Sequence, residues 1–197
     1  ALYKSMEFTG EGLKNLSMDD RLCMANMAIE AGAKNGIFNV DEKTLAYIKE
    51  HSVKPFTVYA ADADAVYDRV IELDLSQLVP MAACPSNPGN VRPVSEIAGL
   101  PVSQVLIGSC TNSSLKDLRM AAAVLKGRQV SPAVSLGIAP GSRQVMQMMS
   151  LDGSLGDLIG AGCRILESAC GPCIGQGFSP ASGTISVRTF NRNFLNR

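Results

Sequence analysis

The sequence predicts an α/β fold with a mainly parallel sheet, and three observations lead to that prediction. Beyond residue 93, short β-rich segments alternate with segments of helical periodicity, as in consecutive βαβ units. The β-rich segments run into turns that contain glycine, proline or serine. Hydrophobic residues make up 46% of the 197 residues, so the chain can bury a sizeable core.

The segment before residue 84 is expected to mix helix and strand. In SMDDRLCMANMAIEAGAK, Ser17 is a good N-cap residue and Gly32 a reasonable stop, which predicts a helix of about four turns. Asn26 and Glu30 then share one face of that helix, and a polar pair at this spacing is usually solvated surface. The apolar face is expected to hold Met18, Leu22 and Ile29.

A connector is predicted over residues 84–93, CPSNPGNVRP. Its three prolines, one glycine and two asparagines allow neither a continuous helix nor a continuous strand. We therefore expect one α/β domain to end within residues 1–83 and a second to occupy residues 94–197.

The first β-rich segment after the connector is VSQVLIG, residues 102–108, and a helix is expected soon after it. That helix is indicated by apolar residues at helical spacing, namely Leu115, Leu118, Ala122 and Leu125. Ser114 and Asp117 form a plausible capping pair at its start. Cys110 therefore lies in the turn between strand and helix, where backbone N–H groups favour an anionic ligand set.

Three more β-rich segments follow, and each delivers a polar turn. AVSLGIAPGS runs into a Pro-Gly turn, and a helix is expected from Arg143. GCRILESAC is interpreted as a strand that ends at Cys170, followed by the glycine-rich turn GPCIGQG. TISVRTF alternates polar and apolar residues like a half-buried strand and leads into NRNFLNR. Both cysteines of ESACGPC thus lie in a loop beyond the carboxyl end of a strand, where α/β sheets place their sites.

Charge and composition exclude several classes of function. Eighteen basic and eighteen acidic residues cancel, and no basic run occurs, so neither DNA nor an anionic membrane is an expected partner. No apolar run approaches the roughly 18 residues of a membrane span, and ALYKSMEFTG lacks the regions of a signal peptide. We expect a small-molecule substrate, a location in the cytoplasm or the mitochondrial matrix, and cysteines that are free or metal-bound.

Three of the six cysteines form a candidate ligand set: Cys110, and a Cys-x-x-Cys pair at Cys170 and Cys173, which begins 60 residues later. Structural zinc sites and electron-transfer 4Fe–4S clusters usually take four protein ligands, so a set of three leaves one metal position open to substrate. The spacing alone permits zinc as well as iron–sulfur. Histidine-assisted thiol catalysis is disfavoured, because the only histidine, His51, lies in a stretch typical of a solvated helix end. The remaining cysteines are interpreted as small core residues, namely Cys23, Cys84 and Cys163.

The chain resembles the aconitase superfamily of iron–sulfur hydro-lyases in the segments VLIGSCTNSSLKDLRMAAAV, ESACGPCIGQG and TFNRNF. The resemblance extends back through NMAIEAGAKNGIF and YDRVIELDLSQLVP and so covers essentially the whole chain. It implies a three-layer α/β/α architecture, with residues 1–83 ending the second family domain and residues 94–197 forming the third. It also implies that Cys110, Cys170 and Cys173 hold a 4Fe–4S cluster whose fourth iron acts on substrate as a Lewis acid.

The resemblance also implies roles for residues around the cluster. Asn26 and Glu30 match the family's Asn-x-x-x-Glu, in which the asparagine lies near the cluster and the glutamate hydrogen-bonds the iron-bound hydroxyl. Asn191 and Arg192 match its Asn-Arg-Asn segment, and Arg197 falls where its second substrate arginine lies. Guanidinium groups match carboxylates in a two-pronged geometry, whereas the residues by themselves allow equally well for two surface arginines.

Two nearby groups are open between a structural role and a ligand-binding role. Asn112 and Ser113, directly after Cys110, could cap the following helix or hydrogen-bond cluster sulfurs, and capping is favoured. Ser142 and Arg143 could meet an anion, but a helix N-cap is the simpler account.

Within the superfamily, the wording of the motifs favours an aconitase-type enzyme of the tricarboxylic acid cycle, which converts citrate to isocitrate through cis-aconitate. The large subunits of isopropylmalate isomerase (3-isopropylmalate dehydratase) and homoaconitase are alternatives, and a non-catalytic metal or iron–sulfur binding module is the alternative from another class. Family enzymes also carry acid–base residues and a catalytic serine in domains that this sequence does not contain. The expected partners are therefore a tri- or dicarboxylic acid and the remaining domains or a small swivel subunit, without which no turnover is expected.

Overall fold

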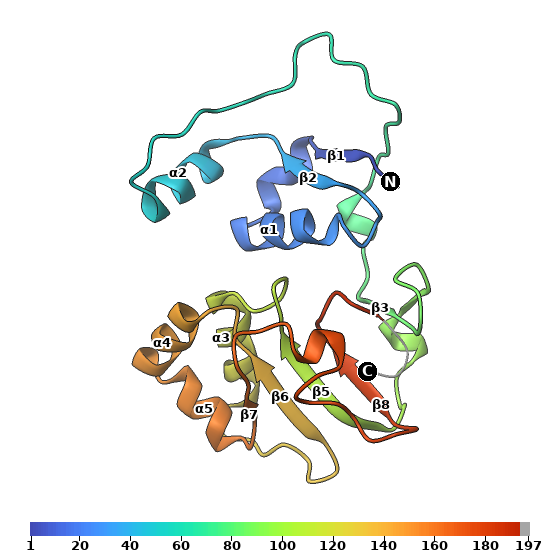
Figure 1. The fold of residues 1–197 in the computed structure, drawn as a ribbon, viewed down its shortest axis with the longest axis vertical. Helices are drawn as coiled ribbons and strands as arrows, with labels where there is room; N and C mark the ends of the chain where they lie inside the picture. The colour runs from blue at the N-terminus through green and yellow to red at the C-terminus, as the bar shows by residue number, and fades with distance from the viewer. Residues whose placement is uncertain (194–197) are drawn as a thin grey trace. The chain divides into compact units, whose positions relative to one another are not determined.

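The computed structural model describes residues 1–193 and divides the chain into two compact units. The first unit is Ala1–Pro80 and the second begins at Met81, just ahead of the predicted connector. Among the helices of the described residues, none has the length and apolar character needed to cross a membrane. Figure 1 shows the helices and strands of each unit.

The first unit is built on one parallel strand pair. Strands β1 (Ser5–Phe8) and β2 (Asn35–Phe38) pair in parallel and stack the rings of Phe8 and Phe38, with 4.7 Å between ring centroids. Parallel neighbours need a crossover connection, and helix α1 (Met18–Met27) supplies it, preceded by the 3-10 turn η1 (Glu11–Asn15). Helix α2 (Glu42–His51) follows, and residues 52–74 then form neither helix nor strand before the turn η2 (Leu75–Gln77).

Helix α1 is shorter than the sequence predicts. The predicted N-cap is confirmed, because Ser17 and Asp20 form a reciprocal capping box. The helix ends at Met27, and the chain continues in tight turns in which Glu30 N donates to Met27 O at 3.0 Å. The prediction that Glu30 lies on the helix itself is therefore wrong.

The predicted apolar face of α1 is also wrong. Leu22 and Ile29 are 49% and 53% exposed, whereas the buried residue of the helix is Arg21, at 2%. Its guanidinium donates to both carboxylate oxygens of Asp41, at 2.8 and 2.7 Å, and to the carbonyl of Leu13 at 2.8 Å. Asp41 at the same time caps α2 by accepting from Thr44 N. One ion pair, buried at its arginine and partly exposed at its carboxylate, thus joins α1, the η1 turn and α2.

The second unit contains a hairpin and a four-stranded sheet. The hairpin pairs β3 (Met81–Ala83) with β4 (Val91–Pro93), so the predicted connector forms its loop and its second strand, before the turn η3 (Val94–Glu96). The sheet has the order β7-β6-β5-β8 and all its neighbours are parallel. Its strands are β5 (Val102–Gly108), β6 (Ser135–Ala139), β7 (Arg164–Ile165) and β8 (Ile185–Arg188). Its helices are α3 (Leu115–Leu125), α4 (Arg143–Asp152) and α5 (Ser154–Gly160).

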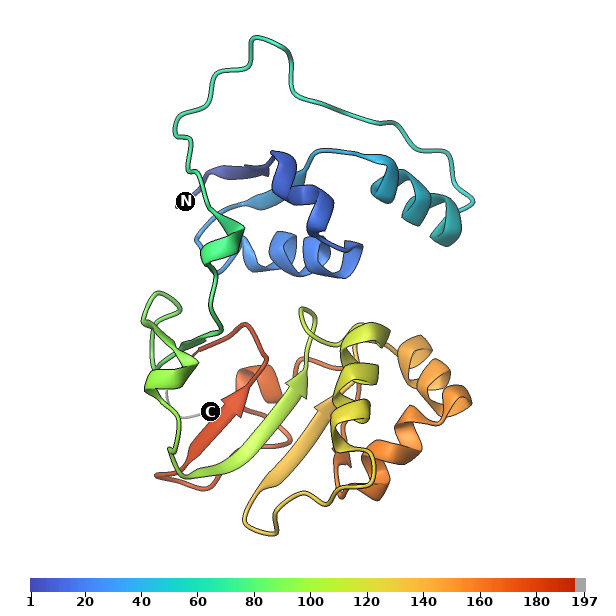
Figure 2. The same ribbon diagram turned by 180° about the vertical axis from the view of Figure 1, so that it is seen from behind.

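Both faces of this sheet are covered, as parallel sheets require. Figure 2 shows α3, α4 and α5 on one face, where Leu118, Ile138, Met149 and Leu158 are fully buried in one apolar cluster. The other face is covered by the loop after β7, which includes the turn η4 (Pro172–Ile174). A second apolar cluster lies there, made of Leu106, Ala139, Cys173, Phe178 and Phe190.

Gly137 in β6 makes room for that second cluster. A Cβ atom there would lie 2.6 Å from the ring of Phe178 and 2.9 Å from Leu106 Cδ2, closer than such atoms approach. Arg164 covers the ring of Phe178, with its Cζ 5.1 Å from the centroid.

The predicted α/β class with a mainly parallel sheet is confirmed. The strand predicted over residues 102–108 has the bounds of β5, and the capping pair of Ser114 and Asp117 is present at the start of α3. The strand expected to end at Cys170 is wrong in length, because β7 stops at Ile165 and the chain turns onto the sheet face instead. In the described residues, the layer on that face consists of a short 3-10 turn and loop rather than long helices.

Candidate functional site

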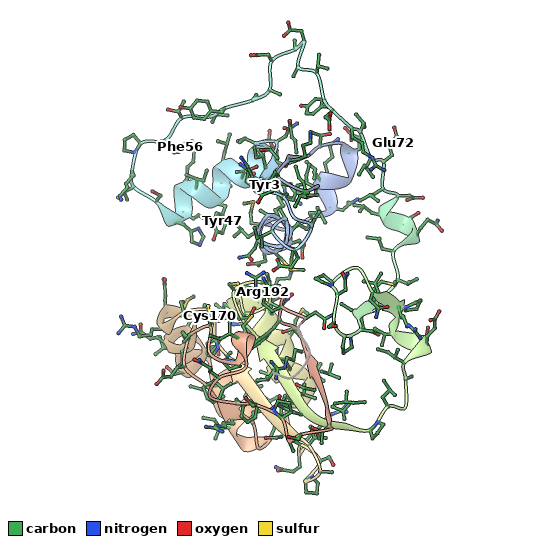
Figure 3. All side chains as sticks on the ribbon, turned by 45° about the vertical axis from the view of Figure 1, so that its right-hand side comes forward. Tyr3, Tyr47, Phe56, Glu72, Cys170 and Arg192 are labelled. Carbon is green, nitrogen blue, oxygen red and sulfur yellow. The ribbon has the colours of Figure 1, made fainter. Side chains whose placement is uncertain are left out.

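Three loops leave the carboxyl ends of parallel strands and carry most of the residues singled out in the sequence. Cys110 follows β5, Cys170 and Cys173 follow β7, and the segment from Asn191 follows β8. Because β5, β6, β7 and β8 are parallel, these loops emerge at one edge of the sheet. Figure 3 shows Cys170 and Arg192 at that end of the second unit, on different loops.

The loop after β5 has a backbone that few residues can adopt. Gly108 has φ +136°, and a Cβ atom there would lie 2.0 Å from the carbonyl oxygen of Ala139. Ser109 follows with φ +76°, which is uncommon for a residue other than glycine. The Ser113 hydroxyl donates to the carbonyl of Ser109 and closes the loop. Cys110 is exposed at its tip.

The loop after β7 presents its two cysteines differently. Cys170 is exposed, whereas Cys173 in η4 is only 8% exposed and belongs to the apolar cluster on the sheet face. The turn is closed by its own backbone, with Gln176 N donating to Gly171 O at 2.7 Å and Gly175 N donating to Pro172 O at 3.2 Å. The buried thiol of Cys173 is thus held in place, whereas Cys170, three residues earlier, is exposed.

The loop after β8 contacts both of the other loops. Asn112 Nδ2 donates to the carbonyl of Thr189 at 2.6 Å, and Thr189 Oγ1 accepts from Gly108 N at 2.9 Å. Cys173 Sγ lies 3.9 Å from Oδ1 of Asn191, which is 8% exposed. The structure therefore brings Asn191 together with one predicted ligand. Arg192 is half-buried, and Arg197 lies outside the described residues.

Of the N-caps expected for α3 and α4, one differs from the prediction and one agrees with it. Ser114 caps α3, so the preference for Asn112 and Ser113 as caps is wrong: they hold the β5 loop to Thr189 and to Ser109 instead. The N-cap expected at Ser142 is confirmed, since its hydroxyl accepts from Val145 N at 3.1 Å.

Arg188 and Gln104 are site residues that the sequence reasoning missed. Arg188 Nη1 donates to the carbonyl of Pro172 at 2.7 Å, and Gln104 Nε2 donates to the carbonyl of Phe178 at 3.2 Å. Gln104 is only 2% exposed. The sequence signal for this role was Gln104 itself, a polar residue in the middle of the otherwise apolar strand segment VSQVLIG. A buried polar side chain needs a hydrogen-bond partner.

The other predicted residues lie apart from these loops in sequence. Cys163 is buried in the helix-side cluster, where burial raises the pKa of its thiol, while Cys23 and Cys84 are half-buried. His51 ends α2 as expected, exposed and with Nδ1 2.8 Å from the carbonyl of Tyr47. In the first unit, Asn26 is exposed near the end of α1 and Glu30 is half-buried in the turns beyond it. Their predicted catalytic roles stay predictions.

The three cysteines fit an iron–sulfur cluster in their chemistry. Thiolates are the ligands that such clusters take, and all six cysteines of the chain lack a disulfide. Within residues 1–193, however, no three Cys, His, Asp or Glu side chains stand close enough together to hold a metal ion.

A parallel α/β sheet with thiols on the loops at its carboxyl edge defines an α/β protein with a candidate metal centre. A comparison with family models gives the particular family. The model of the aconitase family (aconitate hydratase) matches residues 2–99 and 94–197, and the chain belongs to that family.

Curated relatives match the whole chain. The 3-isopropylmalate dehydratase large subunit of Clostridium kluyveri is 51% identical over 198 residues, which are 100% of this chain and 47% of the relative. The proteins of the same name from Acetivibrio thermocellus and Caldicellulosiruptor bescii are 50% and 49% identical and are covered over 47% and 46% of their length. The chain thus spans about half the length of the curated relatives it matches.

Proposed function

We propose that this chain carries the cluster-binding part of a hydro-lyase of the 3-isopropylmalate dehydratase type. Two findings support the proposal: membership of the aconitase family, and relatives about 50% identical that are named 3-isopropylmalate dehydratase large subunit. They favour this alternative over the citrate-converting enzyme of the tricarboxylic acid cycle that the motif wording suggested.

The observation that carries the proposal is that three loops emerge at one edge of the sheet. Two of them carry the three cysteines, and the third carries Arg192. In this proposal Cys110, Cys170 and Cys173 hold a 4Fe–4S cluster. When bound, the cluster would supply a Lewis acid that polarises a carbon–oxygen bond of the substrate. Asn191 contacts Cys173 and so links the ligand loop to the segment that contains Arg192.

The proposed substrate is a hydroxy dicarboxylic acid. Arg192 offers a guanidinium group at the carboxyl edge of the sheet, which suits a substrate carboxylate because it stays charged and donates in a fork. We further propose that a small subunit completes the enzyme, as the name of the relatives suggests. The location proposed for this enzyme is the cytoplasm. Residues 1–197 alone are then expected to show no turnover.

Anaerobic reconstitution with iron and sulfide tests the proposal. The chain should take up one 4Fe–4S cluster, and 3-isopropylmalate should shift the Mössbauer resonance of a single iron site more than citrate does. A larger shift with citrate would favour the tricarboxylate substrate instead.

Two cysteine variants provide the matched control. Cys110→Ser should prevent assembly of an intact cluster, whereas Cys163→Ser, whose thiol is buried on the opposite face of the sheet, should leave cluster content unchanged. Tight zinc binding with no cluster in the unmodified chain would show a non-catalytic metal module and overturn the proposal.

A further inference from the structure

We propose that Arg188 is a positioning residue for the Cys170–Cys173 turn, and that with Gln104 it sets where the buried thiol of Cys173 can meet a metal. The inference rests on the proposed cluster function, because a fixed thiol matters most when it must share a metal with two others. It is carried by a hydrogen-bonded network that joins β5, β8 and the turn η4.

The guanidinium of Arg188 donates hydrogen bonds in two directions. Nη1 donates to the carbonyl of Pro172 at 2.7 Å, inside the turn that holds Cys173. Nε donates to Ser186 Oγ at 2.9 Å, and Nη2 donates to Gln104 Oε1 at 3.2 Å. One half of the group therefore holds the turn and the other half is held by the sheet.

Gln104 anchors the same loop at a second point. Its Oε1 also accepts from Ser186 Oγ at 2.8 Å, and its Nε2 donates to the carbonyl of Phe178 at 3.2 Å. The loop is thus attached to β5 and β8 both at Pro172 and at Phe178, on either side of the glycines at 175 and 177. Those glycines have φ +83° and +76°, so the chain between the two anchors turns sharply.

This arrangement leaves Cys173 little freedom. The residue directly follows Pro172, is 8% exposed, and is also in contact with Asn191, which is equally buried. The carbonyl of Pro172 accepts from Arg188 Nη1 at 2.7 Å and from Gly175 N at 3.2 Å, so the side chain of Arg188 anchors the turn that contains Cys173. Groups that hold a metal ligand in place commonly change metal affinity by about 10-fold to 100-fold when they are removed.

Arginine suits this position better than lysine. Its planar group donates in several fixed directions at once, whereas a lysine ammonium is a point charge on a flexible stem. Lysine at position 188 would keep the charge but would not reproduce the fork that joins Pro172 to Ser186 and Gln104. The variant Arg188→Lys therefore separates the effect of the hydrogen-bond geometry at position 188 from the effect of the positive charge.

Thiol alkylation of the cluster-free full chain tests directly whether Arg188 keeps the Cys170–Cys173 turn in place. Iodoacetamide at fixed pH, read by mass spectrometry, should modify Cys173 about tenfold faster in Arg188→Met than in the unmodified chain, because a charge-assisted anchor is lost. Arg188→Lys should fall between the two. Arg128→Met, which removes an exposed arginine between α3 and β6, should leave the rate unchanged.

Cys163 in each sample distinguishes a local effect from unfolding. It is as buried as Cys173 but lies in the helix-side cluster, so its alkylation rate should not change. Equal acceleration at both thiols would show that Arg188 merely stabilises the fold, and an unchanged rate at Cys173 would show that Arg188 does not hold the turn. Either result overturns the inference.

Cluster uptake is a second measurement, and it tests whether the contacts of Arg188 affect metal binding. After anaerobic reconstitution, Arg188→Met should require about tenfold more iron and sulfide for half-maximal cluster absorbance, with Arg188→Lys recovering part of the loss. Unchanged cluster uptake in Arg188→Met overturns the link to the cluster. If the unmodified chain takes up no cluster, the proposed function fails, and the alkylation rates still decide whether Arg188 positions Cys173.

Discussion

The two units differ in the kind of side chain that they bury. In the second unit, Leu106, Leu118, Ile138 and Leu158 are fully buried on the two faces of one sheet. In the described first unit, the one large side chain buried to a similar degree is Arg21, and the buried hydrophobic residues there are alanines. The cysteine loops therefore stand on an apolar scaffold, whereas the helix that carries Asn26 is held by an ion pair.

That difference predicts that the two units respond differently to mutation, to pH and to an added side-chain atom in the core. An apolar scaffold loses stability mainly when volume is removed or added. A scaffold held by a buried ion pair loses stability when one charge is neutralised. Hydrogen exchange resolves the two units separately, because it reports local opening free energies along the chain.

The largest effect is expected from Ile138→Ala in β6. Ile138 is 0% exposed at the centre of the helix-side cluster, so its truncation should destabilise the second unit by about 3–4 kcal/mol. Hydrogen exchange should show faster exchange throughout β5 and β6, with the amides of α1 and α2 unchanged. The control Val124→Ala, at a residue 65% exposed on α3, should change stability by less than about 0.5 kcal/mol.

Asp41→Asn should weaken the first unit by about 2 kcal/mol, between the values for exposed and for buried ion pairs, since the Asp41 side chain is 37% exposed. The hydrogen bond from Arg21 holds the pKa of Asp41 well below its usual range. A carboxyl group with a lowered pKa stabilises the fold above about pH 4 and loses this contribution as the pH falls toward the lowered value.

Acid titration followed by hydrogen exchange of α1 and α2 measures this effect. The unmodified first unit should lose stability progressively below about pH 4, and Asp41→Asn should remove that part of the pH dependence. Asp68→Asn is the matched control, because its pair with Lys4 is exposed on both sides. An acid response that persists in Asp41→Asn would mean that other carboxyl groups hold α1 to α2.

Two glycine-to-alanine changes in the second unit should have opposite signs. Gly137→Ala places a Cβ atom 2.6 Å from the ring of Phe178 and should cost about 1–2 kcal/mol through overpacking. Gly156→Ala in α5 meets nothing within 4 Å and should stabilise by about 0.5–1 kcal/mol. Urea denaturation followed by circular dichroism would measure both, and equal signs would contradict the packing of Phe178 on β6.

The smallest effect is expected at the start of α4. Ser142→Ala removes the hydroxyl that accepts from Val145 N and should cost about 1 kcal/mol. Ser150→Ala, which removes an exposed hydroxyl that donates within the same helix, serves as the control and should be nearly neutral. Similar losses in both variants, measured by thermal unfolding, would argue against Ser142 as the cap.

Sequence patterns located the elements whose signals are local. The short β-rich run VSQVLIG predicted the bounds of β5, and pairs of a hydroxyl and a carboxyl residue located the caps at Ser17 and Ser114. The end of α1 was missed because the chain leaves the helix through tight turns that still contain helix-forming alanines. The burial of Arg21 was missed because its partner, Asp41, lies 20 residues away.

The candidate site divides in the same way. The two loops that carry the three cysteines could be placed from the sequence because each follows a β-rich segment. The role of Asn112 was missed because its partner, the carbonyl of Thr189, lies in the loop after β8, 77 residues along the chain. The network of Arg188 and Gln104 has the same origin, since it depends on the parallel pairing of β5 with β8. Contacts between distant segments follow from topology, which local patterns do not contain.

The close approach of Gly108 to Ala139 has a consequence for protein engineering. Because a Cβ atom at position 108 would lie 2.0 Å from a backbone oxygen, no rearrangement of a flexible side chain can relieve the clash. A library that diversifies this loop to change the ligand or the metal can explore positions such as Thr111 only if it keeps glycine at 108. The first cysteine of the candidate set therefore lies two residues from a position at which only glycine is usable, and substitutions there would disrupt the loop for reasons unrelated to metal chemistry.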